Sequence, residues 1–531
     1  MDNNKNVIIA ILLMVSVWMF FNPGKQPEAP VADETAVTSA VSSETEQPAA
    51  PASLAVAEPV LSAKPAPETK VLLDTPLYTV EFNSLGAKIT TLQLHHYTET
   101  ASADSPQVKV VDAATPRLAT LSLQGKNGIT LAADTAYALL SPPDKTSLSG
   151  ADQVELTFRT SVNGLIVDRI FTLRGDSYVI GVQTLLRNTG TAEVNGELEL
   201  SLQQQWDDKA KSDMVVFNGA SSLVDGSLEQ VKVDDLKEKS PSYGSGTVWT
   251  SFETKYFMSA LIPEAGASEK VRVLREGNTI FNVMTTPFFK LAPGASSSFS
   301  YQSYFGPRDE KVLESVGYQL SEAISFGWFT PIAVPLLKTL KFFYGYIGNY
   351  GVAIILLTLI IKLIFWPLTH KSYASMKSMQ KLQPEMTKIK ERFKNDRQRQ
   401  GQEMMELYKK HRVNPMGGCL PMVIQIPVFF ALYRVLYQAI ELRHAPFVFW
   451  LTDLSAPDPY YITPLIMGAT MFIQQKLTPS TADPTQQKVM LIMPVVFTAM
   501  FLNFPAGLVI YWLVNNLLTI VQQLYIHRTM S

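Results

Sequence analysis

Five apolar, almost uncharged segments lie in the C-terminal third of the chain, and they limit what it can fold into. They cover residues 347–369, 418–440, 459–476, 489–503 and 505–526. A helix needs about 20 mostly apolar residues to cross the ~30 Å hydrocarbon core of a membrane. Several segments contain proline, which membrane helices tolerate because neighbouring helices and water satisfy the freed backbone groups. The pattern predicts a core of five membrane-spanning helices.

The N-terminal region predicts an anchor followed by a linker. The apolar run at residues 7–21 would be about 22 Å long as a helix, and no small-residue cleavage site follows it directly. We therefore expect residues 1–21 to form an uncleaved transmembrane anchor, with a cleavable signal peptide as the alternative. Residues 22–75 are rich in Pro, Ala, Glu, Thr and Ser. Such a segment cannot bury enough apolar surface to offset its ordering entropy, which predicts a flexible linker.

Residues 76–320 carry a different pattern. Apolar and polar residues alternate, as at residues 77–82, and turn sequences such as Asn163-Gly164 separate the alternating runs. Many strands punctuated in this way predict a large antiparallel β-sandwich with a core of its own. Residues 321–346 are apolar but contain two prolines, which favours an amphipathic helix lying in the membrane interface.

The distribution of basic residues predicts the orientation in the membrane. Residues 370–417 contain twelve Lys and Arg against five Asp and Glu. Short basic loops stay on the cytoplasmic side. Alternation then places both termini and the loop at residues 477–488 inside, and the β domain outside.

The same basic loop carries apolar residues at three- and four-residue spacing, which predicts a helical hairpin. The candidate contact residues on it are Lys377, Lys381, Lys388, Arg392 and Lys394. The functional interpretation is a docking site for ribosomal RNA or an acidic partner, or a methionine-rich surface for apolar peptides. The alternative is that the methionines pack the hairpin and the basic residues only set the topology.

The sequence lacks the short motifs of several enzyme classes. It contains no phosphate-binding P-loop, no H-E-x-x-H zinc motif and no G-x-S-x-G nucleophile elbow. The single cysteine, Cys419, excludes an internal disulfide and a multi-cysteine metal site. The net charge of -2 excludes a uniformly basic nucleic-acid binder. We therefore expect a protein that is not an enzyme and that has no cofactor and no metal.

The strongest single signal is Lys362, which lies inside the first apolar segment of the core. A lysine at the bilayer centre costs about 2.5–3.5 kcal/mol on insertion scales, so it should face the bundle interior or a water-filled cavity. Thr358 lies one helical turn away on the same face. The apolar segments offer no acid at membrane depth to pair with Lys362. The alternative is that Lys362 snorkels to the cytoplasmic headgroups.

Other apolar segments offer polar side chains to the same interior. Tyr511 and Asn515 lie one turn apart on the last segment, and Gln425 lies on the second. Each alone predicts only an interhelical hydrogen bond of about 1 kcal/mol or less. Together with Lys362 they predict a hydrated pocket. Further expected contributors are Gln474, Gln475, Asn503, Trp512 and Asn516. Arg434 is a second embedded base, but it lies nearer the outer end and can snorkel outwards.

Four strings of residues carry a resemblance to a known family. They are NPMGGCLP at 414–421, QIPVF at 425–429, DLSAPDPYYI at 453–462 and FPAGL at 504–508. Together they resemble the YidC/Oxa/Alb family of membrane protein insertases, and the N-terminal anchor with a large external domain is similar to its Gram-negative form. The resemblance implies a multi-pass protein of the bacterial inner membrane. It also implies a periplasmic β-supersandwich similar to sugar-mutarotase folds, although no sugar-binding residues can be matched.

The resemblance also implies a groove that is open to the cytoplasm and lipid but closed outwards. The family's groove contains a positive charge, usually arginine, and Lys362 stands at that position, which keeps the charge but loses the planar guanidinium. Trp512 stands where a tyrosine is common. The expected substrate-binding groove residues are Lys362, Thr358, Gln425, Phe429, Tyr511, Trp512 and Asn515.

The function that the resemblance implies is insertion and chaperoning of newly made inner-membrane proteins. The implied partners are these nascent proteins, the bilayer, the Sec translocon with its accessory subunits, and the ribosome and signal-recognition-particle pathway at the cytoplasmic loops. The protein is expected to be a monomer. Two other classes stay open: a membrane channel or secondary transporter with a periplasmic sensor domain, and a membrane-tethered carbohydrate-binding protein.

Overall fold

The computed structural model describes residues 68–141, 143, 145–207, 217–411, 413, 420–478 and 484–529, with only the backbone described at 420–424 and 484–488. The predicted anchor at residues 1–21 and most of the predicted linker lie outside these residues. The linker's predicted end at residue 75 is too late. Strand β1 (Lys70–Asp74) already pairs with β2 (Tyr78–Asn83), because Val71 and Leu73 alternate with polar residues and are buried.

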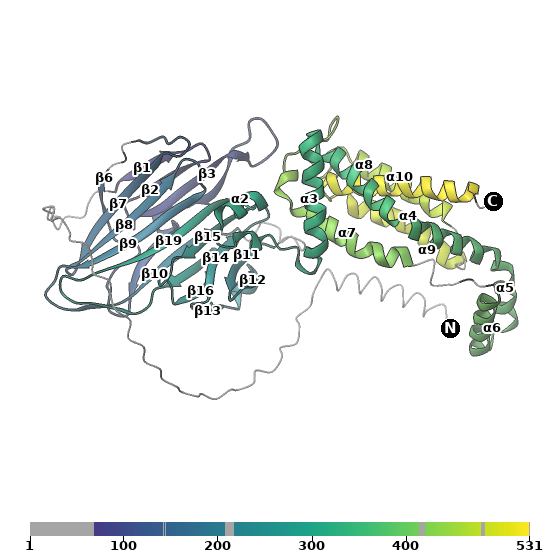
Figure 1. Ribbon diagram of the computed structural model, residues 1–531, viewed down its shortest axis with the longest axis horizontal. Coiled ribbons are helices and arrows are strands. Elements are labelled where there is room, and N and C mark those ends of the chain that lie inside the picture. The colour runs from purple at the N-terminus through teal and green to yellow at the C-terminus, as the bar shows by residue number, and fades with distance from the viewer. Residues whose placement is uncertain are drawn as a thin grey trace.

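Three antiparallel sheets form the β domain (Figure 1). The nine-stranded sheet runs in the order β12 (Ser227–Lys232), β11 (Gly219–Val224), β14 (Thr247–Glu253), β15 (Phe257–Pro263), β19 (Ser296–Pro307), β9 (Val179–Asn188), β8 (Leu165–Arg174), β7 (Gln153–Val162) and β6 (Ala138–Ser141). The six-stranded sheet runs β13 (Ser242–Tyr243), β16 (Lys270–Glu276), β17 (Thr279–Thr285), β10 (Val194–Gln205) and β18 (Phe289–Leu291), with β5 (Ser122–Lys126) also pairing with β10. The four-stranded sheet is β1, β2, β3 (Lys88–Thr98) and β4 (Gln107–Asp112).

Local sequence explains the hairpin of β7 and β8, near one edge of the large sheet. Strands β7 and β8 pair from Val162 to Leu165 across the two residues Asn163 and Gly164. Both central residues have positive φ, 52° and 80°, which is the geometry that Asn-Gly favours in a two-residue hairpin turn. The core face of β8 then packs aromatic side chains, and the rings of Phe82 and Phe171 lie 4.9 Å apart.

Helix α2 (Glu310–Val316) leads from the β domain to α3 (Thr330–Ile347). Figure 1 shows α3 lying across the ends of the other long helices, between them and the β domain. This direction suits a helix in the membrane interface. The predicted start at residue 321 is too early, because residues 320–323 and 327–329 form separate 3₁₀ turns. Pro331 occupies the first turn of α3, where its missing N–H has no intrahelical partner to lose.

Each of the five apolar segments lies on one helix. These helices are α4 (Tyr350–Lys381), α7 (Leu420–Gln438), α8 (Ile462–Leu477), α9 (Pro484–Phe501) and α10 (Ala506–Thr529). Among the described residues, α4 and α10 are long and apolar enough to cross a membrane, and residues 489–501 form a shorter apolar helix. Helix α4 continues beyond the predicted end of its span at residue 369, because leaving the apolar segment removes no backbone hydrogen bond.

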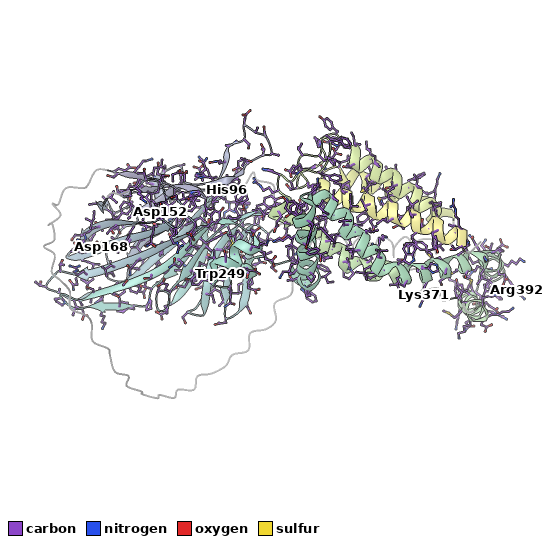
Figure 2. All side chains as sticks on the ribbon, turned by 45° about the horizontal axis from the view of Figure 1, so that its top comes forward. His96, Asp152, Asp168, Trp249, Lys371 and Arg392 are labelled. Carbon is purple, nitrogen blue, oxygen red and sulfur yellow. The ribbon has the colours of Figure 1, made fainter. Side chains whose placement is uncertain are left out.

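The basic loop forms α5 (Gln383–Arg392) and α6 (Arg397–Lys410) after α4 ends. The hairpin therefore begins near residue 382 and not at 370. Figure 1 shows it at the end of the bundle far from the β domain. Figure 2 places Lys371 and Arg392 toward that end, and Trp249 in the β domain at the other.

The bundle has an apolar interior and an apolar outer surface. Helix α10 packs between α4 and α8, α9 packs on α8, and α7 packs mainly on α3. Leu363 and Ile364 on α4 and Val495 on α9 are 59%, 67% and 67% exposed. Large exposed aliphatic surfaces of this kind mark contact with lipid or another protein.

Candidate functional site

Lys362 lies in the interior of the bundle, as its charge requires. Its side chain projects from α4, and the residue is 9% exposed. Its Nζ donates a hydrogen bond of 2.8 Å to Oγ1 of Thr519 on α10. None of the ion pairs in the described parts of the chain includes Lys362. The snorkelling alternative is therefore not the arrangement seen, because the ammonium is directed to a neighbouring helix.

Thr358 lies one turn before Lys362 on the same helix, and its hydroxyl bonds within that helix. It is 1% exposed, and its Oγ1 donates to the backbone oxygen of Ile354 at 2.7 Å. The hydroxyl is thus used within α4. Thr358 makes the surroundings of Lys362 more polar without binding the ammonium.

Gln425 and Asn515 join α7 to α10. The Gln425 Nε2 atom donates to Asn515 Oδ1 at 3.2 Å, and both side chains are half-buried. Tyr511, one turn before Asn515, is almost completely buried. The structure therefore brings three predicted groove residues to one interface, between the helix that carries QIPVF and the last helix.

An aromatic layer lies on the outer side of the cation. Trp512 is its centre, with ring centroids 4.8 Å from Phe429, 5.4 Å from Phe501 and 6.4 Å from Phe497. At about 1.5 Å per residue, Trp512 lies ~9 Å along α10 and Thr519 ~20 Å. Because α10 begins at the end of the bundle nearer the β domain, this layer separates Lys362 from that end.

A polar seam continues from Lys362 towards the hairpin, between α4 and α10. Gln522 Nε2 donates to Thr369 Oγ1 at 2.6 Å. Gln523 Nε2 donates to Tyr373 Oη at 2.9 Å and to Thr478 Oγ1 at 2.9 Å. The sequence analysis missed this seam, although Thr519, Gln522 and Gln523 recur at the three- and four-residue spacing of one helix face.

Other predicted contributors divide into two groups. Asn516 is buried and donates to Thr470 Oγ1 on α8 at 3.4 Å, and Gln474 and Gln475 are half-buried. Asn503 is exposed in the turn between α9 and α10, so its predicted place in the interior is wrong. Arg434 is half-buried with Nη1 beside Gly327, in the turn before α3, which agrees with outward snorkelling.

Comparisons with known proteins decide the family. Residues 342–531 match the family described as 60Kd inner membrane protein, and residues 70–339 match the YidC periplasmic domain. Membrane protein insertase YidC of Citrifermentans bemidjiense is 45% identical, and the alignment covers 99% of both chains. The insertase of Geobacter metallireducens is 44% identical with the same coverage. The chain belongs to the YidC family of membrane protein insertases.

A solved structure of an active YidC insertase is also similar. It is 18% identical, covers 87% of this chain and 92% of its own, and superposes with a TM-score of 0.37. At a TM-score this low, family membership rests on the sequence matches. Membership confirms the predicted resemblance, the helical core with a large all-β periplasmic domain, and the insertase class, which is not a class of enzymes. It places the protein in an inner membrane, with nascent membrane proteins and lipid as its partners.

The hairpin of α5 and α6 has a small core of its own. Leu382, Met386 and Leu407 are buried, and Met379 and Met404 pack against them. These methionines therefore fill the hairpin, as the packing alternative predicts, while Met405 is 52% exposed. Of the predicted basic residues, Lys377 is half-buried. The other four are exposed: Lys381, Lys388, Arg392 and Lys394. Arg392 and Arg399 both lie over the ring of Phe393, at 5.5 and 5.3 Å.

Two acids explain the string DLSAPDPYYI between α7 and α8. Asp453 Oδ1 accepts from the backbone N–H of His444 and from the N–H and Oγ of Ser455. Asp458 is fully buried. Burial alone would raise its pKa, but the hydrogen bonds that its carboxylate accepts from Thr463, Tyr460 and Trp450 hold the pKa below the usual value.

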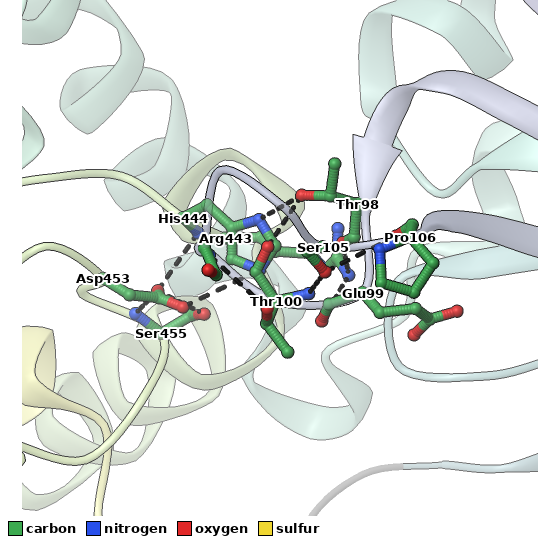
Figure 3. A network of polar contacts seen from close by, with 10 residues as sticks. Thr98, Glu99, Thr100, Ser105, Pro106, Arg443, His444, Asp453 and Ser455 are labelled. Atoms are coloured by element: carbon green, nitrogen blue, oxygen red, sulfur yellow. Dashed lines mark hydrogen bonds and ion pairs between the residues drawn. The ribbon is translucent and has the colours of Figure 1, made fainter.

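The same loop meets the periplasmic domain (Figure 3). Arg443 Nη2 donates to the backbone oxygens of Thr98, the last residue of strand β3, and of Glu99, which follows it. The Arg443 guanidinium also lies over the ring of Phe257, 5.3 Å from its centroid. On the other side of the junction, Lys341 of α3 pairs with Glu310 of α2 and with Glu441, which follows α7. The junction is therefore built from charged groups of both halves.

Proposed function

We propose that this insertase moves polar segments of nascent membrane proteins through a groove centred on Lys362. One observation supports this most strongly: a lysine is buried between membrane helices with a neutral threonine as its hydrogen-bond partner. A buried ammonium without an acid keeps its charge available for a substrate carboxylate. The other residues that we assign to this groove are Thr358, Gln425, Phe429, Tyr511, Trp512 and Asn515.

The driving force comes from the apolar segment of the substrate. Its transfer into lipid yields about 25 cal/mol per Å² of apolar surface, so no nucleotide is needed for this step. Lys362 attracts an acidic tail and lowers the barrier for the polar part. The apolar part of α9, residues 489–501, is only about 20 Å long, and a short apolar stretch thins the bilayer locally.

Access to Lys362 requires a local separation of helices, because the residue is 9% exposed. Helix α7 is the element that we propose to move. It packs mainly on α3, and it reaches α10 through the Gln425–Asn515 hydrogen bond and the ring contacts of Phe429. Helix α4 stays on α10 through the polar seam, and the part of the aromatic layer between α9 and α10, Trp512 with Phe497 and Phe501, keeps the outer side closed.

We infer that the hairpin and both termini face the cytoplasm. The hairpin lies at the opposite end of the bundle from the periplasmic domain (Figure 1), and its exposed basic residues suit that side. The same residues could contact ribosomal RNA or the signal-recognition-particle pathway through charge. Cooperation with the Sec translocon is part of the same proposal.

Reconstituted liposomes test the groove. The native chain is compared with Lys362→Arg, Lys362→Ala and Lys362→Glu for insertion of a short membrane protein with an acidic translocated tail, scored by protease protection. We expect the native chain and Arg to work and Ala and Glu to fail. Lys290→Ala, an exposed lysine of the β domain, is the control for loss of one positive charge. Equal insertion by all four Lys362 forms would contradict a role for the cation.

A further inference from the structure

Thr519 lies where α10 faces Lys362, and its hydroxyl takes part in two hydrogen bonds. Its Oγ1 donates to the backbone oxygen of Asn515 at 2.6 Å and accepts from Lys362 Nζ at 2.8 Å. Thr519 is 5% exposed. Threonine in a helix commonly bonds back to the carbonyl four residues earlier. Because that bond uses the only hydroxyl proton, the oxygen presents lone pairs alone to Lys362, which is the polarity that an ammonium needs.

A lysine needs such a partner more than an arginine does. Its ammonium ends a flexible four-carbon chain and lacks the rigid fork of a guanidinium. A free lysine at membrane depth relaxes along its own helix toward the nearest headgroups. On the hairpin side of Lys362, however, Gln522 and Gln523 donate hydrogen bonds to Thr369 and Tyr373, so α4 and α10 are held together there. Thr519 therefore binds the ammonium at the end of this α4–α10 interface that is farther from the hairpin.

We propose that Thr519 is a positioning residue for the groove cation: it holds the Lys362 ammonium in the bundle interior, where an acidic segment of the substrate can reach it. This inference rests on the proposed function of Lys362 and adds the group that orients it. Thr519 acts through Lys362 and does not itself bind the substrate.

A double-mutant cycle tests the proposal in full-length protein in liposomes. Thr519→Val keeps the shape and removes the hydroxyl, and Thr519→Ser restores it. Both are made with Lys362 and with Lys362→Met, and each is tested on substrates whose translocated tail carries no acid or several acids. With Lys362 present, we expect Thr519→Val to lower insertion of the acidic substrate about tenfold, on the order of one hydrogen bond to a charged group, and Thr519→Ser to restore it.

In the Lys362→Met background we expect Thr519→Val to have no further effect, because the group that it positions is gone. Thr498→Val is the matched control. It removes a threonine hydroxyl that donates to the backbone oxygen of Pro494 within α9, a helix that packs on α8, so its effect should be the same in both backgrounds. Equal losses from Thr519→Val in both backgrounds, or a Thr519→Ser variant as poor as Val, would make Thr519 a packing residue and overturn the inference.

A second measurement is independent of insertion. Site-resolved acylation of lysines, read by mass spectrometry, reports whether the Lys362 amine is reachable from water. We expect Thr519→Val to raise labelling of Lys362 several-fold and to leave Lys377 unchanged, and unchanged Lys362 labelling overturns the inference. If Lys362→Met inserts the acidic substrate normally while Thr519→Val still exposes the amine, the proposed function of the groove fails but the positioning contact stands.

Discussion

Two lysines are buried among the residues that the structure describes, and their surroundings differ. Lys362 in the bundle has Thr519 as its hydrogen-bond partner. Lys88 in the β domain is 1% exposed and lies near a second buried cation, Arg169, whose Nη1 donates to the backbone oxygens of Gly86 and Ala87. Burial and then Arg169 lower the pKa of Lys88 to about 8. The charge of Lys362 has a proposed use in insertion, whereas the charge of Lys88 destabilises the folded β domain.

The depressed pKa of Lys88 predicts a pH-dependent stability of the β domain. Between about pH 8 and the ordinary value of 10.5, the unfolded chain binds more protons than the folded one. The free energy of unfolding should therefore rise with pH across this window, by about 1–3 kcal/mol. Urea unfolding followed by tryptophan fluorescence at pH 7.5, 9 and 10 measures it. Lys88→Met should remove that part of the rise and exposed Lys290→Met should keep it; identical slopes in native and Lys88→Met protein would refute the assignment.

At the scale of single elements, the start of α8 depends on Asp458. Its carboxylate accepts from the backbone N–H and the hydroxyl of Thr463, at 2.7 and 2.8 Å. Asp458→Ala leaves these buried donors without their partner and should destabilise the helical core by about 1–3 kcal/mol. Thermal unfolding in detergent micelles measures this change.

The same bonds set a pH dependence with a defined sign. Because the pKa of Asp458 lies below its ordinary value of 3.8, its stabilisation is present above that value and lost as pH falls through the folded pKa. Asp458→Asn should therefore be less sensitive to acid than the native chain. Asp104→Ala, which removes an exposed acid in the β3–β4 loop, is the control. If it reduced the acid sensitivity as much as Asp458→Asn does, that result would argue against capping by Asp458.

The hairpin predicts a second effect at this scale. Leu407→Ala removes a buried side chain from the small core between α5 and α6, and we expect about 2 kcal/mol of local destabilisation, at the low end of such truncations. Hydrogen exchange of residues 383–410 measures it. Met405→Ala, at an exposed position of α6, should leave exchange unchanged; a defect in ribosome binding by that variant alone would support the methionine-surface interpretation.

At the scale of the whole molecule, charged contacts connect the periplasmic domain to the outer ends of the membrane helices. Arg443 contacts the β3–β4 loop, and Lys341 connects α2, α3 and the end of α7. Glu441 and Arg443 follow α7, the helix that we propose to move. A movement of α7 would therefore alter the contacts of Glu441 and Arg443 at the junction.

This arrangement predicts that the junction sets the orientation of the domain. Arg443→Ala combined with Lys341→Ala should broaden the distance between spin labels at Glu229, on the exposed edge strand β12, and Tyr460, in the loop before α8. Cys419 is first replaced by serine so that only these sites are labelled. Arg392→Ala in the hairpin is the control with one charge removed elsewhere. An unchanged distribution in the double variant would mean that the remaining contacts, such as Lys255 over the ring of Tyr437, are sufficient to hold the domain.

Local patterns were sufficient to predict much of the fold. The Asn163-Gly164 turn, the alternating strands, the apolar segments and the amphipathic hairpin all depend on residues close in sequence. The ends of elements were predicted less well. Helix α4 continues to Lys381, and β1 begins inside the predicted linker, because hydrogen bonds and strand pairing decide an end and composition does not.

The sequence by itself predicted that Lys362 faces the bundle interior, with snorkelling as the alternative, because a charge within an apolar span is costly in lipid. Only the tertiary structure decided which group receives it. Thr519, Gln522 and Gln523 lie about 150 residues from their partners on α4, and a polar residue on one helix can face any neighbour. Asn503 shows the converse. Its polarity suggested a place in the bundle interior, but it is exposed in the turn between α9 and α10. Helix periodicity determines the face that a residue occupies, whereas the packing of whole helices determines what that face meets.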